Sequence, residues 1–292
     1  MTQAAAAKTP PRSSQQPSAW RRFRRNQLGV VGAIIVLTLL ILAIFAPQLA
    51  PYDPSVQSLL QRRQPPSGEF WLGTDEFGRD IFSRLLFGTR FTLLISITSV
   101  SIGLVIGSVL GIIAGYVGGL TSGVIMRLMD LLLAFPYLLL AIIIVSALGP
   151  GVRNTIIAIG IWTVPAFARV SRGAVASIRE RDFVQAAKAL GNQRPRIIWR
   201  HILPNTLATL LVYASLYLAY AILMESALSF LGLGVQPPTP SWAVMISSGR
   251  NYITSAPHIA TIPGIAIAVA VLGFNLLGDA LRDALDPRTM PR

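Results

Sequence analysis

The sequence predicts an all-α polytopic membrane protein with about six transmembrane helices. Two features of the composition lead to this fold class: 53% of the 292 residues are hydrophobic and only 13% are charged, and the mean hydropathy is +0.60. A soluble domain would carry roughly a quarter of charged residues. The third observation is that the apolar residues are gathered in long runs. Each run can cross a hydrocarbon core of about 30 Å as a helix, which satisfies its own backbone hydrogen bonds.

The first predicted span is the apolar run 28–46. Residues 1–19 consist largely of Ala, Pro, Ser and Gln without an apolar period, and they predict a disordered tail that ends in a basic cluster at Arg25. A basic cluster followed by an apolar run is also the pattern of a cleaved signal peptide. The length of the run and the prolines that follow it at Pro47 and Pro51 favour a retained span.

Five further apolar runs complete the predicted set. They cover residues 91–115, 126–148, 155–171, 205–231 and 259–281. Each is long enough to span the membrane as a helix. The run 155–171 is the weakest of the five, because Pro165 and Arg169 interrupt it.

The distribution of basic residues predicts that both termini face the cytoplasm. Cytoplasmic loops carry an excess of Lys and Arg. With the N-terminus inside, most of the 25 lysines and arginines fall in the N-terminal tail, after the run 155–171 and near the C-terminus. This orientation requires an even number of spans, and it places residues 172–204 in the cytoplasm.

The first external loop, residues 47–90, is long for a linker. Within Asp75–Leu86 the residues Phe77, Ile81 and Leu85 recur every four positions. This period predicts a short amphipathic helix at the membrane surface. The helix could bind a partner or simply cover the bundle, and the sequence does not choose between these roles.

The side-chain inventory excludes most enzymatic chemistry. The chain has no cysteine, so disulfides, thiolate nucleophiles and Cys-ligated metals are excluded. The two histidines, His201 and His258, are far apart in sequence, and neither Lys8 nor Lys188 lies in the G-x-x-x-x-G-K-[ST] loop that binds ATP phosphates. The sequence therefore predicts no catalytic residue, no metal site and no ATP hydrolysis by this chain.

The formal net charge of +13 does not indicate nucleic-acid binding, because the basic residues cluster beside apolar runs, as membrane orientation requires. Two acidic pairs, Asp75 with Asp80 and Asp279 with Asp283, lie next to arginines at the borders of the runs. They are predicted to form solvated ion pairs rather than a catalytic pair of carboxyl groups.

Four glycines follow one another at a spacing of four in the second run, at Gly103, Gly107, Gly111 and Gly115. They form a flat stripe on one helix face, where the backbone of a neighbouring helix can approach closely and gain van der Waals contact. Helix packing is the favoured interpretation, and a seam of this kind could also slide.

Two acidic residues, Asp130 and Glu225, lie nearly within apolar runs. An ionisable group in lipid is costly and is a functional candidate by default, so both are candidates for lining an aqueous path. Asp130 is three residues from Arg127, and the two are predicted to pair near the inner surface. Glu225 has no basic neighbour at helical spacing, so it either faces a path or bonds to a neighbouring helix.

The most informative segment is 182–204, a basic stretch between two apolar runs. Asp182 is predicted to cap a first helix, on which Phe183, Ala187 and Leu190 share one face. Gly191 is predicted to end this helix in the left-handed conformation.

A second short helix is predicted to follow. Pro195 suits its first turn, and Arg196 and Arg200 are four residues apart on it. A compact helix–glycine–helix unit with the small pair Ala186-Ala187 is a shape that a groove in another protein can accept. The segment therefore predicts a protein-binding knob, with an ordinary basic loop as the alternative.

These residues resemble the cytoplasmic loop of binding-protein-dependent ABC importer permeases, whose pattern is E-A-A-x3-G-x9-I-x-L-P. The chain has Gln185-Ala186-Ala187, then Gly191, and finally His201-Ile202-Leu203-Pro204. The spacing is intact. Gln185 replaces the glutamate of the pattern and so removes a charge, and His201 replaces an isoleucine.

Three further motifs resemble the dipeptide/oligopeptide/nickel permease subfamily and, within it, the second-permease or C-subunit type. They are residues 72–84 (LGTDEFGRDIFSR), 231–242 (LGLGVQPPTPSW) and 275–288 (NLLGDALRDALDPR). Ala243 stands where this type often has glycine. The resemblance covers roughly residues 20–288.

The resemblance implies a type-1 ABC importer permease fold. It divides the chain into a cytoplasmic tail at 1–25, a first transmembrane helix with its external loop at 26–89, an ABC type-1 transmembrane domain at 90–283, and a cytoplasmic tail at 284–292. The coupling loop of the domain would span about 176–204.

The resemblance also implies a function and partners. The chain would be a permease subunit of an ATP-driven importer of di- or oligopeptides in a bacterial- or archaeal-type plasma (inner) membrane. It would work by alternating access with a second permease subunit, two ATPase subunits that bind ATP and Mg, and an external solute-binding protein, and would itself bind no cofactor. The implied coupling residues are Gln185, Ala186, Ala187, Gly191, Arg196, Arg200, Leu203 and Pro204.

Other functions remain open at this point. The same class of importer carries glutathione, nickel chelates or sugars. A stand-alone secondary transporter is a different class, but such proteins often show inverted repeats and paired ionisable groups at mid-membrane, and this chain shows neither pattern. A membrane scaffold or receptor that transports nothing is a third possibility.

Overall fold

The computed structural model describes residues 19–285. Most of the two predicted tails, residues 1–18 and 286–292, therefore lies outside the described range. Within that range the protein is a bundle of helices without a β-strand, and a single isolated bridge joins Thr74 to Asp80.

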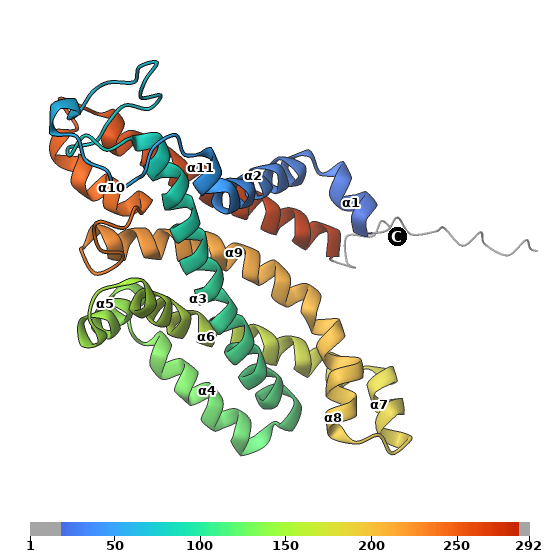
Figure 1. The fold of residues 1–292 in the computed structure, drawn as a ribbon. Helices are drawn as coiled ribbons and strands as arrows, with labels where there is room; N and C mark the ends of the chain where they lie inside the picture. Colours follow the sequence, from blue (N-terminus) through green and yellow to red (C-terminus); the bar gives the residue numbers. More distant parts are fainter. Residues whose placement is uncertain (1–18, 286–292) are drawn as a thin grey trace, which may run out of the picture.

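Figure 1 shows the helices packed side by side and coloured in chain order. In chain order they are α1 (Ala19–Arg25), α2 (Gln27–Leu49), α3 (Ile81–Val117), α4 (Gly119–Leu133), α5 (Tyr137–Leu148), α6 (Val152–Arg179), α7 (Asp182–Ala189), α8 (Arg194–Ile197), α9 (Leu203–Phe230), α10 (Trp242–Gly249) and α11 (His258–Leu285). Three short turns are η1 (Leu59–Gln61), η2 (Ile198–Ile202), which is π-helical, and η3 (Arg250–Tyr252).

The predicted apolar runs fall largely on helices, but the run 126–148 is divided into α4 and α5 by a break at residues 134–136. Within residues 19–285, 4 helical segments are long and apolar enough to cross a membrane, namely α2, α3, the continuous stretch Arg194–Phe230 and α11. The α4–α5 pair, bent by 88° at its break, is a further candidate. The predicted fourth run lies in α6, which is outside this count because polar residues such as Asn154 and Arg169 lower its hydropathy.

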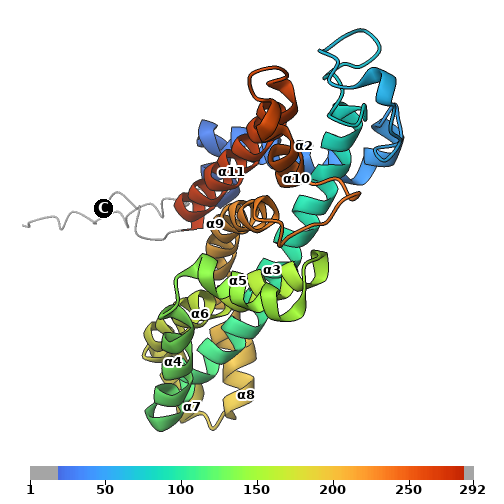
Figure 2. The same ribbon diagram turned by 90° about the vertical axis from the view of Figure 1, so that its left-hand side faces the viewer.

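The two ends of the described chain lie at one end of the bundle. Asn26 Nδ2 donates a hydrogen bond of 3.3 Å to Asp283 Oδ2, and α1 packs on α11. In Figure 1 these parts lie to the right, as do α7 and α8, whereas residues 50–80 and α10 lie to the left. Figure 2 likewise shows residues 50–80 and α7 at opposite ends of the molecule.

The most extensive helix pair is α3 against α6. The four regularly spaced glycines of α3 face α6, where their nearest neighbours are Thr163, Val164, Ala168 and Arg172. The backbones can approach only because no side chain stands between them, so the contact is dispersion over a long seam. This pair is the spine to which α4, α5 and α9 attach.

The external loop does not contain the predicted surface helix. α3 begins only at Ile81, and residues 74–80 form a turn. The reason is local: Asp75 Oδ1 accepts hydrogen bonds from the backbone N–H groups of Phe77 (2.8 Å) and Arg79 (3.0 Å), and Gly78 has φ +74°. A side chain that bonds nearby backbone in this way competes with a helix.

The ion pairs of this loop are buried, which corrects the prediction that they are solvated. Asp75 Oδ2 lies 2.6 Å from Arg79 Nε and 3.4 Å from Arg84 Nε. Asp80 is also buried, and its Oδ2 accepts from the backbone N–H of Ser83 at 2.7 Å and so caps α3. Since buried charges require partners, this cluster fixes the loop to the start of α3.

Candidate functional site: the segment between α6 and α9

The segment predicted to bind a partner forms a compact projection at one end of the bundle. Val184 and Ala187 are the buried residues of α7. They pack in a cluster with residues from α3, α6, α8 and η2, which are Ile112, Tyr116, Val175, Ile178, Ile197 and Ile202. α7 is therefore seated on the ends of the long helices rather than suspended in a loop.

The three residues predicted to share one face of α7 differ in their exposure. Phe183 and Leu190 are exposed, Leu190 by 83%, while Ala187 is buried beside Val184. Asp182 is the first residue of the helix, and the N-cap position belongs to Arg181, which makes no side-chain cap. The carboxylate of Asp182 still lies in the first turn, where the helix dipole favours negative charge.

α7 ends in a left-handed turn at Gly191, whose φ is +77°. The backbone N–H of Gly191 donates to Lys188 O at 2.9 Å, and that of Asn192 donates to Ala187 O at 3.1 Å. Asn192 Nδ2 donates to the same carbonyl at 3.1 Å. These bonds occupy carbonyl groups that a helix end leaves free, so the turn after α7 is well defined.

The second predicted helix is not separate. α8 contains only Arg194–Ile197, with Pro195 in its first turn, and it continues through η2 into α9. Arg200 therefore lies in the π-helical turn and not on the same short helix as Arg196. A proline at the start of a helix costs nothing because its missing N–H has no helical partner there, whereas no sequence signal marked the continuation into α9.

Gln185 and Arg179 connect three helices. Gln185 Nε2 donates to the backbone oxygen of Arg179 at the end of α6, over 3.0 Å. Arg179 Nη1 in turn donates to the carbonyls at the end of α3, to Tyr116 O at 3.2 Å and to Gly115 O at 3.4 Å. These bonds link α7 to the ends of both α6 and α3. The role of Arg179 could not be predicted from the sequence, because its hydrogen-bond acceptors are backbone carbonyl groups more than 60 residues away.

A polar groove of about 510 Å³ is bordered by α7, α8 and the ends of α3 and α6, and its lining includes the acidic Glu180. Arg179, Lys188 and Arg194 are among its lining residues, with Gln185 and Asn192. The outer face beside it is mixed. Ala186, Leu190 and Trp199 are exposed apolar residues, and Arg196 and Arg200 are exposed bases. The exposed surface at this end of the molecule therefore carries both apolar and basic side chains.

Asp130 does not pair with Arg127, as its spacing predicted. It pairs across helices with Arg169 of α6, whose Nη2 lies 2.6 Å from Asp130 Oδ1. The two side chains are 54% and 53% exposed. A pair within one helix needs only the correct spacing, but here the packing of α4 on α6 brings a closer partner.

Glu225 is completely buried in α9. Its Oε1 accepts from Ser229 Oγ at 2.9 Å and from Ser241 Oγ at 3.1 Å, and Ser229 Oγ accepts from the backbone N–H of Val235 at 3.1 Å. The carboxyl group thus ties α9 to the loop that leads to α10. Of the two alternatives from the sequence, this geometry favours a bond to neighbouring structure over exposure to a path.

Gln185→Glu is expected to loosen α7, although glutamate is the residue of the family pattern. A carboxylate cannot donate to Arg179 O, so the 3.0 Å bond is lost, at a cost of about 1 kcal/mol. Hydrogen exchange at the amides of residues 184–192 should become several-fold faster. Gln193→Glu, at the exposed residue before α8, is the control and should exchange like the unaltered chain. Equal exchange rates in Gln185→Glu and the unaltered chain would show that the Gln185–Arg179 hydrogen bond does not hold α7 in place.

Two family models match the chain. Residues 107–291 match the family described as binding-protein-dependent transport system inner membrane component, and residues 14–66 match the N-terminal TM domain of oligopeptide transport permease C. The first match covers more than half of the chain and includes α6 to α9.

Curated relatives match over nearly the whole chain. The dipeptide transport system permease protein DppC of Alkalihalophilus pseudofirmus is 47% identical over 270 residues, covering 92% of this chain and 89% of that protein. The di/tripeptide transport system permease protein DppC of Pseudomonas aeruginosa is 47% identical over 275 residues, with 92% and 91% covered. The glutathione transport system permease protein GsiD of Escherichia coli O157:H7 is 44% identical over 270 residues, with 92% and 89% covered.

Solved structures with the same fold include inward-facing conformations of the MetNI methionine ABC transporter, with a TM-score of 0.58 and 17% identity, covering 70% of this chain and 98% of that one. An amino acid ABC transporter follows with a TM-score of 0.52 and 16% identity, covering 68% and 92%. At these identities the likeness concerns the fold, which is that of type-1 ABC importer permeases. The chain therefore belongs to the binding-protein-dependent transport system inner membrane components, and within them to the C-type permeases of the dipeptide and oligopeptide branch.

Proposed function

We propose that this chain is a permease subunit of an ATP-driven importer of di- and oligopeptides. The two relatives of highest identity quoted above are dipeptide and di/tripeptide permeases, and the chain covers about nine-tenths of each. As in other members of this family, the chain would form half of the path with a second permease, while two separate ATPase subunits bind ATP and Mg, and an external binding protein delivers the substrate.

The observation that carries the coupling role is the construction of α7. One face is held by the buried Val184 and Ala187, and the other leaves Ala186 and Leu190 uncovered. We assign α7, α8 and the start of α9 as the segment that an ATPase subunit grips, with Gln185 positioning α7. The contact residues proposed from the sequence remain Ala186, Ala187, Gly191, Arg196, Arg200, Leu203 and Pro204, although Ala187 serves by packing inward.

The same proposal fixes sidedness. With α7 on the ATPase side, both ends of the described chain lie in the cytoplasm, since they share one end of the bundle with α7. The loop 50–80 and α10 then face the binding protein. We place the protein in the plasma (inner) membrane, with residues 90–283 as its transport domain.

Glutathione is the second candidate substrate, because the glutathione permease quoted above is 44% identical. Glutathione is itself a modified tripeptide, so a path that accepts varied short peptides could accept it too. Which of these substrates the external binding protein supplies distinguishes a peptide importer from a glutathione importer.

The proposal is tested by purifying the tagged full-length chain from its native membrane in detergent. A second permease and ATPase subunits should co-purify, and vesicles reconstituted with the binding protein should take up dialanine faster than glutathione while hydrolysing ATP. Purification of the chain alone without ATPase activity, together with uptake driven by an ion gradient, would instead identify a secondary transporter.

A further inference from the structure

Four aromatic side chains form one surface across three helices. Tyr137 of α5 lies 5.8 Å from Trp162 of α6, Trp162 lies 5.7 Å from Tyr217 of α9, and Tyr217 lies 5.8 Å from Tyr220, all measured between ring centroids. Phe167 packs beneath Tyr217 at 5.3 Å and is buried. We call Tyr137, Trp162, Tyr217 and Tyr220 the aromatic surface.

The aromatic surface is exposed, and its residues on α9 lie away from both ends of that helix. Tyr137 is 58% exposed and Tyr220 is 56% exposed. Tyr217 is near the middle of α9, about 20 Å from either end of that helix at 1.5 Å per residue. Tyrosine and tryptophan on lipid-facing positions are typical of the membrane–water interfaces and not of this depth.

The hydroxyl groups of this surface have no hydrogen-bond partner among the residues that the structure describes. Tyr137, Tyr217 and Tyr220 make no hydrogen bond through their hydroxyls to any residue in the range 19–285. A hydroxyl placed in hydrocarbon without a partner costs several kcal/mol, and lipid tails offer no hydrogen bonds. These hydroxyls therefore require water, a substrate or a polar partner in front of them.

The backbone beside the aromatic surface leads independently to the same requirement. α4 and α5 are broken at residues 134–136, with a bend of 88°, immediately before Tyr137. These three residues are exposed. Non-helical backbone at membrane depth is stable only where protein covers it or where it lines a water-filled cavity.

A third observation concerns charge. Trp162 and Arg169 are seven residues apart on α6 and so share one face of that helix. Arg169 forms its half-exposed ion pair with Asp130 there, toward the end that carries α7. Exposed charges are costly on a lipid-facing surface and rare there. The ion pair therefore indicates that the face of α6 shared by Trp162 and Arg169 is open to water.

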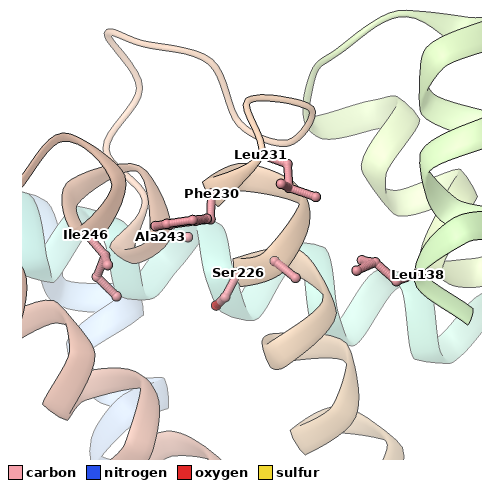
Figure 3. A pocket seen from close by; sticks show the side chains of 7 residues that line it. Leu138, Ser226, Phe230, Leu231, Ala243 and Ile246 are labelled. Carbon is pink, nitrogen blue, oxygen red and sulfur yellow. The ribbon is translucent and has the colours of Figure 1, made fainter. Parts of the chain in front are cut away.

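The gap between α5 and α9 is also hollow. A cavity of about 360 Å³ lies between these helices and α10. Figure 3 shows Leu138, which follows Tyr137, projecting from α5 toward α9, with Phe230, Leu231 and Ile246 on the other side. The cavity is lined mainly by apolar side chains, whereas the aromatic surface carries hydroxyl groups.

We propose that the aromatic surface lines the aqueous path and directly contacts the peptide in transit. Its rings would stack on apolar and amide groups of the substrate, and its hydroxyls would exchange hydrogen bonds with the peptide main chain. Both contacts are common to every peptide, whatever its side chains, which suits a carrier of varied short peptides. The identity of the ligand rests on the proposed function; the access of water to the surface does not.

The natural absence of cysteine permits a direct test. Tyr220→Cys and the control Leu211→Cys are made in the full-length chain, in membrane vesicles that contain the assembled transporter. Leu211 is equally exposed, at 53% compared with 56%, but lies on the opposite face of α9. A charged, membrane-impermeant methanethiosulfonate reagent should modify Tyr220→Cys at least tenfold faster than Leu211→Cys, and excess dialanine should slow that modification at least threefold.

The outcomes separate the two claims. Equal, slow modification of Tyr220→Cys and Leu211→Cys would overturn the path assignment. Fast modification that dialanine does not slow, in vesicles whose unaltered transporter imports dialanine, would overturn the substrate contact. Failure of the unaltered transporter to import dialanine would instead refute the proposed function, and the labelling rates would still decide whether the surface faces water. If Tyr220→Cys does not fold, Tyr137→Cys provides the same test.

Discussion

Gly107→Leu is expected to prevent the chain from forming its folded bundle. A Cβ atom at Gly107 would lie 2.8 Å from the Cβ of Phe167 and closer still to the backbone oxygen of Val164. A backbone atom cannot move aside like the end of a flexible side chain, so α3 and α6 must separate and lose contact along their seam. We expect the free energy of unfolding to fall by more than about 3 kcal/mol, above the usual range for overpacked sites. The variant should give no monodisperse peak in size-exclusion chromatography in detergent.

Gly173→Leu is the matched control for this prediction. Gly173 lies in the same helix pair, on α6, but a Cβ there meets no atom within 4 Å. This variant should chromatograph and unfold like the unaltered chain. Gly107→Ala brings the same overlapping Cβ but no larger side chain, so α3 and α6 should separate by less, and the midpoint of thermal unfolding should fall without folding being abolished. A Gly107→Leu protein as stable as Gly173→Leu would show that the seam is looser than the structure indicates.

Ala186→Trp is expected to abolish ATP-driven uptake while leaving the chain folded and inserted. Ala186 is exposed on the outer face of α7, so a larger side chain there can extend into solvent. A groove in an ATPase subunit that accepts a methyl group would have to exclude the indole ring. We expect uptake of dialanine to fall more than tenfold, which corresponds to about 1.4 kcal/mol or more, and co-purification of the ATPase to weaken.

The position is chosen to separate docking from folding. Gly191 is a poorer choice, because its φ of +77° strains any residue with a side chain. Gly173→Trp, at an exposed position of α6 before the coupling loop where an added Cβ meets no atom within 4 Å, controls for the added ring. Normal uptake by Ala186→Trp would remove α7 from the coupling interface, and loss of thermal stability in detergent would trace the defect to the fold instead.

Several features could be predicted from the sequence because they depend on local properties. Long apolar runs identify the helices, since lipid leaves the backbone no other partner. The glycine stripe in α3 indicates close packing, and Gly191 indicates the end of α7, because each follows from the absence of a side chain at a known helical position. The pattern around Gln185 identified the segment, although the amide's bond to Arg179 could not be read from it.

Other features were mispredicted because residue spacing alone does not show which partner a polar side chain takes. Asp130 has Arg127 one turn away, yet Arg169 of another helix is its partner. The period of Phe77, Ile81 and Leu85 suggested a surface helix, but the carboxylate of Asp75 folds the residues after it into a turn and pairs with Arg84.

The sequence by itself determined the membrane class, the helical segments and the position of the segment between α6 and α9, because hydrophobicity, glycine spacing and helix caps act within a few residues. Only the tertiary structure decided which side chains meet. It placed Glu225 in a buried bond to the loop before α10 and gathered four aromatic rings from α5, α6 and α9 on one open surface. Such contacts depend on how helices dock, and their partners are chosen by proximity in space rather than along the chain.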